Sequence, residues 1–277
     1  LVFNIMTFSI IIIFFILGLI IGSFLNVVIL RYNTDRSLGG RSSCMSCQNN
    51  LFWYELIPIF SFFALKGRCK TCKTKISIQY PLVELISGVI FASLFWKFSS
   101  LFYLDTLIFA FTYAYYVIIF SILLIICVYD IKHKIIPDTL VFIFIAFSFV
   151  GMFFFNLRDY GLNFFPHIPS FFEFLGTFIV ALFFASIWLI SHGKWIGLGD
   201  AKLALGLGFF LGMIKVLSAT VLSFWIGAIV GIILIILNKI NGLSNKINMK
   251  SEIPFAPFLV LGAFLVFLFN FNFFPTF

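Results

Sequence analysis

Long apolar runs determine what this chain can fold into before any motif is considered. Three of them, Phe8–Leu30, Leu107–Tyr129 and Val216–Leu237, hold about 20 residues each without a charged side chain. A helix of that length spans the roughly 30 Å hydrocarbon core of a bilayer. Only 10% of the residues are charged and 62% are hydrophobic, so the chain lacks the polar surface of a water-soluble globule. The sequence therefore predicts an all-α, polytopic membrane protein.

Five further apolar segments bring the expected number of transmembrane helices to about eight. They are Pro81–Trp96, Thr139–Leu157, Phe171–Ile190, Ala201–Met213 and Phe255–Phe273. Two of these, Pro81–Trp96 and Ala201–Met213, are short for a full crossing. We expect the second to be a partial helix whose Gly-rich start packs inside the protein. The 43 phenylalanines are expected to be lipid-facing bulk.

Basic residues concentrate in the segment 31–80. It holds eight Lys and Arg against two Asp and Glu, a net charge of +6 out of +8 for the chain. The positive-inside rule predicts that this loop is cytoplasmic, and anionic lipid at the membrane surface suits its charge. Both termini are then expected outside. The expected division is 1–30 as the first transmembrane helix, 31–80 as the loop and 81–277 as the transmembrane core.

Two CxxC pairs in this loop predict a metal site. The cysteines are Cys44, Cys47, Cys69 and Cys72, with 21 residues between the pairs. Four thiolates at such spacing suit a tetrahedral, structural Zn²⁺, and a loop of about 50 residues is too small to build much core without one. A pair of disulfides is the alternative, although cytoplasmic thiols stay reduced. Cys127 stands alone inside a span and is expected to be a buried apolar residue.

A basic cysteine loop also fits a nucleic-acid binder, with Phe52, Trp53 and Tyr54 as stacking residues. Membrane topology already explains the charge, so we expect no nucleic-acid partner. The aromatic rings are instead expected at the interface of the lipid bilayer.

Two aspartates at the margins of apolar helices are candidates for catalysis. Asp130 ends the third expected helix and Asp200 begins the sixth, and the helix count brings both to the cytoplasmic boundary. Ionisable groups so close to lipid are costly and are functional suspects by default. Gly197 and Gly199 precede Asp200 and would let a substrate backbone approach its carboxylate.

Other roles stay open for these acids. Asp130 could pair with Lys132 or Lys134, and Asp138 fits the N-cap of the fourth expected helix. A transporter that relays protons or binds a cation through Asp130 and Asp200 is a second functional hypothesis, which the nearly pure Phe, Leu and Ile helix centres disfavour. A third is a membrane anchor that presents a zinc module, which would leave the aspartates without a role.

Taken together, these residues resemble the prepilin peptidases, the membrane aspartyl enzymes that mature type IV pilins and related pseudopilins. The resemblance runs from Gly22 to about Pro257. Its motifs are Gly22-Ser-Phe-Leu-Asn26, the two CxxC pairs, Trp53-Tyr-Glu-Leu-Ile-Pro58, Gly67-Arg-Cys69, Tyr80-Pro-Leu-Val-Glu84, Asp130 through Asp138, and Gly197-Leu-Gly199-Asp200. The last motif alone is also similar to presenilin-type proteases, which lack the cysteine loop.

The resemblance implies an enzyme of the bacterial cytoplasmic (inner) membrane. It would remove the basic leader of a prepilin or pseudopilin at the cytoplasmic boundary and methylate the new N-terminus from S-adenosylmethionine. Asp130 and Asp200 would be the catalytic pair. The cysteine loop and Gly67 would belong to the region linked with methyl transfer, whose S-adenosylmethionine site the sequence does not identify.

Two further polar residues have expected partners. Glu84 lies in the first turn of the second expected helix, where it could meet the cationic leader or interact favourably with the helix dipole. The loop at +6 would repel a basic leader, so an acid is the better candidate contact. Asn26 is expected to hydrogen-bond between helices.

Overall fold

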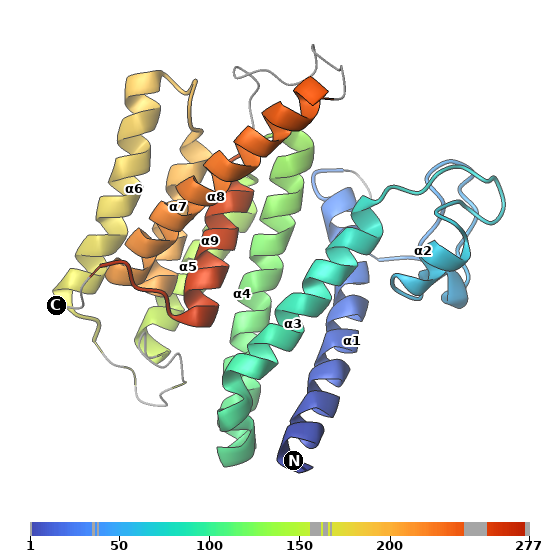
Figure 1. The fold of residues 1–277 in the computed structure, drawn as a ribbon, viewed down its shortest axis with the longest axis horizontal. Helices are drawn as coiled ribbons and strands as arrows, with labels where there is room; N and C mark the ends of the chain where they lie inside the picture. Colours follow the sequence, from blue (N-terminus) through green and yellow to red (C-terminus); the bar gives the residue numbers. More distant parts are fainter. Residues whose placement is uncertain are drawn as a thin grey trace. The chain divides into compact units, whose positions relative to one another are not determined.

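The structure is a computed structural model that describes residues 2–34, 37, 39–155, 162, 166, 168–240 and 254–274. This described part contains helices, turns and three isolated bridges, and no strand. The long helices in Figure 1 are α1 (Val2–Arg31), α3 (Gln79–Leu104), α4 (Thr106–His133), α5 (Asp138–Phe154), α6 (Phe171–Ser191), α7 (Leu198–Leu211), α8 (Met213–Ile240) and α9 (Ala256–Phe269). Two short helices, η1 (Trp53–Leu56) and α2 (Phe60–Ala64), lie in the loop that follows α1.

These eight long helices correspond one to one with the expected spans. Five of them, α1, α3, α4, α6 and α8, contain a stretch long and apolar enough to cross a membrane. The other three are shorter, with 17 residues in α5 and 14 each in α7 and α9. The all-helical, multi-pass class is therefore confirmed, whereas eight full crossings are not.

The helix α3 is longer than the sequence predicts and ends at Leu104 instead of Trp96. Serines in its second half donate to helix carbonyl groups, so they do not end the helix. Asp105 ends it and caps α4, because Asp105 Oδ1 accepts the backbone N–H groups of Leu107 and Ile108 at 2.9 and 3.0 Å. One residue therefore joins two long helices.

The chain divides into two compact units, Leu1–Ile125 and Ile126–Phe277, with the boundary inside α4. The segment between α1, which ends at Arg31, and α3, which begins at Gln79, lies within the first unit. The four cysteines belong to the first unit, and both candidate aspartates belong to the second.

In the first unit, small residues let α1 pack closely on α3. A Cβ atom on Gly22 would lie 2.8 Å from the Cα atom of Glu84, which is too close for any side chain. Small residues serve the same purpose in many membrane helix pairs. Asn26 is 1% exposed and donates to the carbonyl oxygen of Tyr80 at 3.1 Å. The expected hydrogen bond between helices is thus confirmed.

Aromatic rings fill the remaining space between α1, α3 and α4. Phe14 stacks on Phe95 with ring centroids 4.6 Å apart, and Phe98 stacks on Tyr116 at 5.1 Å. Phe95 and Phe98 are 0% and 2% exposed. The expectation that the phenylalanines are lipid-facing bulk is therefore wrong for these residues, which form part of the core.

In the second unit, α7 packs between α5 and α6. A Cβ on Gly206 would lie 2.5 Å from the Phe144 ring on α5, and one on Gly208 would lie 2.7 Å from the Cα of Thr177 on α6. Ten of the 14 residues of α7 are buried. The sequence predicted a short helix enclosed by protein for this segment. Because α7 is enclosed, its first turn, which carries Asp200, is buried.

Candidate functional site

Asp130 lies in the last turn of α4 and is 5% exposed. Helix α4 ends there because Lys134 has a φ of 55°, and its N–H donates to the carbonyl oxygen of Asp130 at 2.7 Å. The backbone N–H of Ala256, at the start of α9, donates to the carboxyl group. Oδ2 is buried and has no hydrogen-bond partner among the residues that the structure describes. Within the described residues no ion pair joins Asp130 to Lys132 or Lys134, so that alternative is not supported.

Asp200 is the third residue of α7 and is 6% exposed. Its Oδ2 accepts the backbone N–H of Gly197, the N-cap residue, at 3.2 Å. The partial positive charge of a helix N-terminus favours a carboxylate at this position. Oδ1 is buried and, in the described part of the chain, has no hydrogen-bond partner.

The carboxyl groups of Asp130 and Asp200 interact electrostatically, although the residues are 70 positions apart in sequence. Two carboxylates that interact in a poorly solvated site repel each other. Among the described residues each keeps one buried oxygen without a partner, and for a carboxyl group this calls for an explanation. Such a pair can donate one proton and accept another.

The two glycines before Asp200 have different surroundings. A Cβ on Gly199 would lie 2.8 Å from the Cβ of Ile136, in the segment that joins α4 to α5. A Cβ on Gly197 would meet only the Oδ2 of Asp200 at 3.6 Å and the backbone nitrogen of Gly199 at 3.9 Å. Space beside the Asp200 carboxylate is therefore open at Gly197 and filled at Gly199.

Asp138 is not the N-cap of α5, contrary to the sequence expectation. Pro137 holds that position and Asp138 is the first helical residue. Its Oδ1 accepts from the Nζ of Lys202 on α7 at 2.8 Å, and the same Nζ lies 5.5 Å from the centre of the Phe142 ring. The Asp138 carboxylate therefore pairs with Lys202 on another helix instead of accepting the backbone N–H groups at the start of α5, as an N-cap would.

The four cysteines come together between α1 and α3, in a segment that we call the cysteine module (residues 41–77). Their sulfur atoms lie within 4.8 Å of one another, and the sulfurs of Cys44 and Cys72 are 3.8 Å apart. In a tetrahedral site with Zn–S bonds of about 2.3 Å, the sulfurs are about 3.8 Å apart. All four thiols are free, and this distance far exceeds the S–S bond length of about 2.05 Å. The cluster therefore fits a tetrahedral metal ion better than two disulfides.

Both CxxC pairs lie in turns of the same design. The N–H of Gln48 donates to the carbonyl of Cys44 at 2.9 Å, and that of Lys73 donates to the carbonyl of Cys69 at 3.0 Å. Gln48 and Lys73 also share a positive φ, 57° and 58°. Equivalent positions are 25 residues apart. Sequence reasoning missed this repeated turn, for which the CxxC spacing itself was the available signal.

Hydrogen bonds favour the metal-binding form of two thiols. The side chain and backbone of Thr74 lower the pKa of Cys72 to about 6, and the Thr74 hydroxyl lies 3.1 Å from the sulfur. Backbone N–H groups of Cys47 and Ser46 lower the pKa of Cys44. The thiolate is the species that binds metal. In the described part of the chain, no other group of three or more possible ligands occurs.

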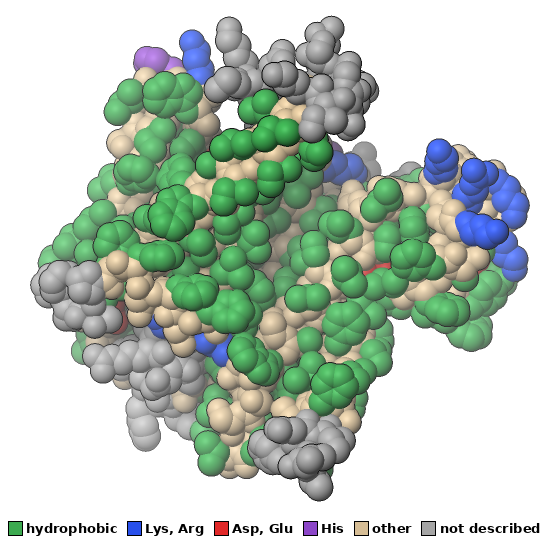
Figure 2. All heavy atoms as spheres, in the orientation of Figure 1, with side chains coloured by type: hydrophobic (Ala, Val, Ile, Leu, Met, Phe, Trp, Pro, Cys, Tyr) green, Lys and Arg blue, Asp and Glu red, His purple; other side chains and the backbone are tan. Residues whose placement is uncertain are grey.

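Cationic and aromatic side chains share the surface of the cysteine module. Lys66, Arg68, Lys70 and Lys73 line a hollow of 410 Å³, and Figure 2 shows the largest group of Lys and Arg side chains in this view on the module. Trp53 in η1 is 77% exposed, and α2 exposes two phenylalanines. Such a surface suits the interface of an anionic membrane.

Comparison with known proteins identifies the family. Residues 16–98 match the Bacterial Peptidase A24 N-terminal domain, and residues 117–232 match the Type IV leader peptidase family. A prepilin leader peptidase/N-methyltransferase of Bacillus subtilis is 32% identical over 260 residues, which cover 93% of this chain and 94% of the relative. This chain belongs to the prepilin peptidase family.

Two further relatives with the same name support the assignment. That of Myxococcus xanthus is 33% identical over 228 residues, covering 80% of this chain and 62% of the relative, and that of Stutzerimonas stutzeri is 28% identical over 282 residues, covering 91% and 88%. No solved structure matches the chain. In this prepilin peptidase family member, the first matched region contains the cysteine cluster and the second contains both aspartates.

Glu84 holds the cysteine module against α3 in this family member. Because α3 begins at Gln79, Glu84 lies beyond its first turn, and the expected helix-dipole role is wrong. The side chain is 7% exposed, and its Oε2 accepts the backbone N–H of Ile59 at 2.8 Å. Ile59 has φ 60° and ψ −51°, and the N–H of Phe60 donates to the carbonyl of Pro58, which makes a strained γ-turn. Contact with a leader stays a prediction.

Gly67 has a conformational reason to be glycine. Its φ is 63°, and a Cβ would lie 3.0 Å from the ring of Phe62. Its N–H donates to the carbonyl oxygen of Phe62 at 2.8 Å, which ends the turn after α2. A link with methyl transfer, which the prepilin peptidase family suggests, stays a prediction for this residue.

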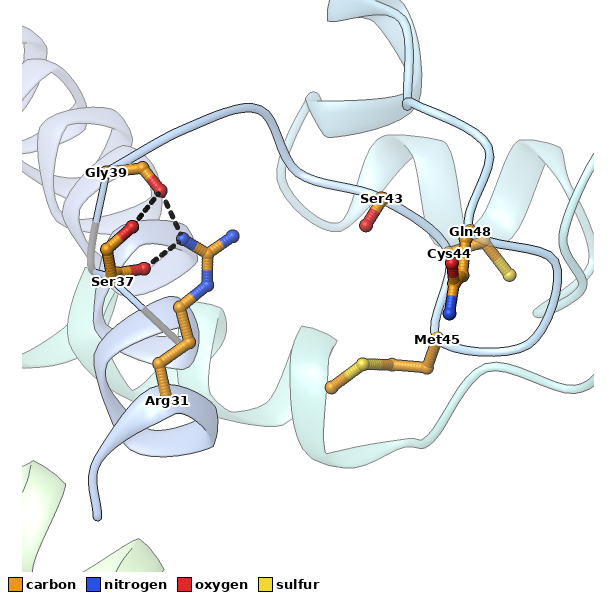
Figure 3. A pocket seen from close by; sticks show the side chains of 7 residues that line it. All are labelled: Arg31, Ser37, Gly39, Ser43, Cys44, Met45 and Gln48. Carbon is orange, nitrogen blue, oxygen red and sulfur yellow. Dashed lines mark hydrogen bonds between the residues drawn. The ribbon is translucent and has the colours of Figure 1, made fainter. Parts of the chain in front are cut away.

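A second hollow, of 420 Å³, lies between the end of α1 and the first CxxC turn (Figure 3). The Nη1 of Arg31 donates to the carbonyl oxygens of Ser37 and Gly39 at 2.7 and 2.6 Å, so the guanidinium fastens the loop to α1. Met45 and Gln48 line the far side. The described residues of the lining include no acidic side chain.

Proposed function

We propose that this chain is a membrane aspartyl endopeptidase that removes the basic leader from type IV prepilins or pseudopilins, with Asp130 and Asp200 as its catalytic residues. The observation that carries the proposal is that two interacting carboxyl groups are buried and that, among the described residues, each keeps one oxygen without a partner. A purely structural acid would be expected to have both oxygens satisfied. Oxygens left in this state are available to a water molecule and to a peptide carbonyl.

In the proposed reaction the ionised carboxyl group takes a proton from water while the protonated one donates its proton to the oxygen of the scissile carbonyl. The hydroxide so formed attacks the carbonyl carbon and gives a tetrahedral intermediate. That intermediate collapses when the carboxyl group that took the water proton gives it to the leaving amine and the C–N bond breaks. The other, now ionised, carboxyl group takes a proton back from a hydroxyl group as the carbonyl re-forms, which restores the dyad. The N–H of Gly197 holds Oδ2 of Asp200 throughout and leaves Oδ1 for the reaction.

The proposal places this chemistry at the cytoplasmic face of the bacterial inner membrane, with both termini outside. The net charge of the segment 31–80 supports the orientation, because positively charged loops stay in the cytoplasm. A prepilin leader is basic and lies on the same side, so it reaches the aspartates without crossing the membrane.

We also propose that the same chain methylates the new N-terminus of the pilin, with S-adenosylmethionine as the methyl donor. Relatives that align over most of the chain are named prepilin leader peptidase/N-methyltransferase, which supports this half of the proposal. Segment 31–80 is its proposed domain. Zn²⁺ held by Cys44, Cys47, Cys69 and Cys72 would fix the fold of the cysteine module, and four cysteines leave no position for a catalytic water.

The test is to reconstitute the purified protein in liposomes, add a prepilin with and without S-adenosylmethionine, and weigh the products by mass spectrometry. We expect loss of the leader in both samples and the mass of one added methyl group only with the cofactor. Folded protein that leaves the prepilin intact would contradict the peptidase proposal. Cleavage without an added methyl group under any condition would contradict the methyltransferase proposal. Proton flux into liposomes that lack substrate would favour a transporter instead.

A further inference from the structure

The segment that joins α4 to α5 is short and begins beside the proposed catalytic residue Asp130. It comprises residues 134–137, and its first N–H donates to the carbonyl of Asp130 at 2.7 Å. A displacement of this linker would therefore move the end of α4 that carries Asp130. The linker also contacts the start of α7, which carries Asp200.

The first contact between this linker and α7 depends on Gly199 having no side chain. Around a Cβ placed on Gly199, three atoms of Ile136 would lie at 2.8, 3.2 and 3.3 Å. Gly199 does not have a positive φ, so a side chain is excluded by packing and not by backbone conformation. Ile136 thus occupies the volume that a side chain at position 199 would need, one residue before Asp200.

The second contact is the ion pair between Asp138 and Lys202, at 2.8 Å. Its partners are partly exposed, with relative side-chain accessibilities of 59% and 29%, so its own stabilisation is small. The position of this ion pair matters more than its strength. Asp138 directly follows the linker, and Lys202 lies two residues beyond Asp200. Contacts at positions 199 and 202 therefore hold the linker on both sides of Asp200.

Gly197 stands in contrast to Gly199. Its φ of −77° and ψ of 154° are open to any residue, and a Cβ there would make no contact closer than 3.6 Å. Nothing in the described protein requires glycine at this position. The free space borders the Asp200 carboxylate, where the proposed function needs a peptide to bind.

We infer that the two glycines have separate roles. Gly199 is a positioning residue that seats Ile136 and so sets the spacing between Asp130 and Asp200, whereas Gly197 is the specificity-determining position that faces the substrate backbone. The inference rests on the proposed peptidase function. A displacement of about 1 Å between reacting groups costs about 100-fold in rate, so even a methyl group at position 199 should matter.

The test compares Gly199→Ala, Ile136→Ala and the double variant in prepilin cleavage. We expect Gly199→Ala to lower kcat about 100-fold with little change in KM. Ile136→Ala should cost less than about tenfold on its own, and in the double variant it should restore most of the kcat lost by Gly199→Ala. Gly197→Ala should instead raise KM about tenfold, and Ile136→Ala should not rescue it. Gly231→Ala is the matched control, because nothing lies within 4 Å of a Cβ at that position.

A double variant no more active than Gly199→Ala would overturn the positioning role, and a KM unchanged by Gly197→Ala would overturn the substrate-facing role. Thermal unfolding of the wild-type protein, Gly199→Ala, Ile136→Ala and their double variant gives a readout that does not need catalysis. Gly199→Ala should lower the midpoint temperature of unfolding. Adding Ile136→Ala in the double variant should recover part of that loss, even if the chain cleaves no prepilin. If Gly199→Ala fails to fold, the linker can still be tested by exchanging the charges of the ion pair. Asp138→Lys and Lys202→Asp should each lower kcat, because each places like charges opposite one another. The double variant, which restores an ion pair, should recover kcat.

Discussion

At the scale of single residues, a buried carboxyl group needs either hydrogen-bond partners or a proton, and Asp130 and Asp200 each meet this need only in part. In the described structure one backbone N–H donates to each group, and one oxygen of each has no partner there. Leaving a buried polar atom unpaired costs about 1–3 kcal/mol. A chain that keeps two such atoms accepts a loss of stability, as functional sites commonly do.

Asp130→Asn and Asp200→Asn should therefore each reduce prepilin cleavage at least about 1,000-fold, because neither proton transfer survives loss of its carboxyl group. The double variant should lose little more, since the two residues act as one unit. Initial rates of leader release, followed by mass spectrometry, provide the measurement. Methylation of a pre-cleaved pilin should persist in both single variants, because that reaction needs no carboxylate pair.

Asp138→Asn is the control for this pair. Its partner Lys202 is partly exposed and the ion pair is a surface contact, so we expect a loss of less than about tenfold. An Asp130→Asn protein that cleaves at nearly the wild-type rate, beside an inactive Asp138→Asn protein, would show that Asp200 works with Asp138 instead.

Glu84→Ala should loosen the cysteine module, because the N–H of Ile59 would be left unpaired at a cost of about 1–3 kcal/mol. Glu84→Gln keeps an acceptor at the same position and should cost less. Limited proteolysis of the reconstituted protein measures the effect as faster cleavage within residues 41–77. Equal proteolysis of both variants would mean that the charge of Glu84, and not its hydrogen bond to Ile59, holds the turn.

At the scale of helices, apolar length was a good predictor because a backbone in lipid must satisfy its hydrogen bonds within its own segment. The helix α4, for example, begins one residue before the expected Leu107 and continues four beyond Tyr129. The misplaced end of α3 has a physical cause: Lys97 and the neighbouring serines look like a boundary in composition, yet all of them can remain in a helix. Asp105, a residue that caps the next helix, was the better signal.

Contacts between distant segments set the limit of the sequence argument. Alternating spans predicted that Asp130 and Asp200 approach each other, since topology alone brings both to one face. The partners of Asp138 and Glu84 could not be found in this way, because Lys202 and Ile59 are 64 and 25 residues away in sequence. Which side chain reaches which depends on packing, and two roles assigned from local sequence were therefore wrong.

Removal of the metal is a test at this scale. Protein purified under reducing conditions should contain one zinc ion per chain, and Cys44→Ser or Cys72→Ser should lose it, because three thiolates and a hydroxyl bind zinc more weakly than four thiolates. Residues 41–77 should then become sensitive to protease, and methyl transfer should fall more than cleavage. Elemental analysis gives the zinc content, and Cys127→Ala, outside the cluster, should keep it. Zinc-free wild-type protein would contradict the metal assignment.

At the scale of the whole molecule, the proposed orientation makes a simple labelling prediction. A cysteine introduced at Ile168, which is 92% exposed before α6, should react in intact cells with a membrane-impermeant thiol reagent. One introduced at exposed Asn49 should react only after the cells are broken, since the positive-inside rule assigns its loop to the cytoplasm. The native thiols of the cluster lie on the same side as Asn49 and should stay unlabelled. The opposite pattern would invert the topology.

The single residue between α3 and α4 has a consequence for how the protein is made. The helices α3 and α4, of 26 and 28 residues, are joined by Asp105 alone. With no longer loop between them, the first helix cannot cross the bilayer while the second remains in water. The Asp105 carboxylate accepts the N–H groups of Leu107 and Ile108, so the turn between the two helices satisfies these groups without water. During synthesis the two helices should therefore enter the membrane as one unit, and lengthening the turn would turn a single insertion event into two.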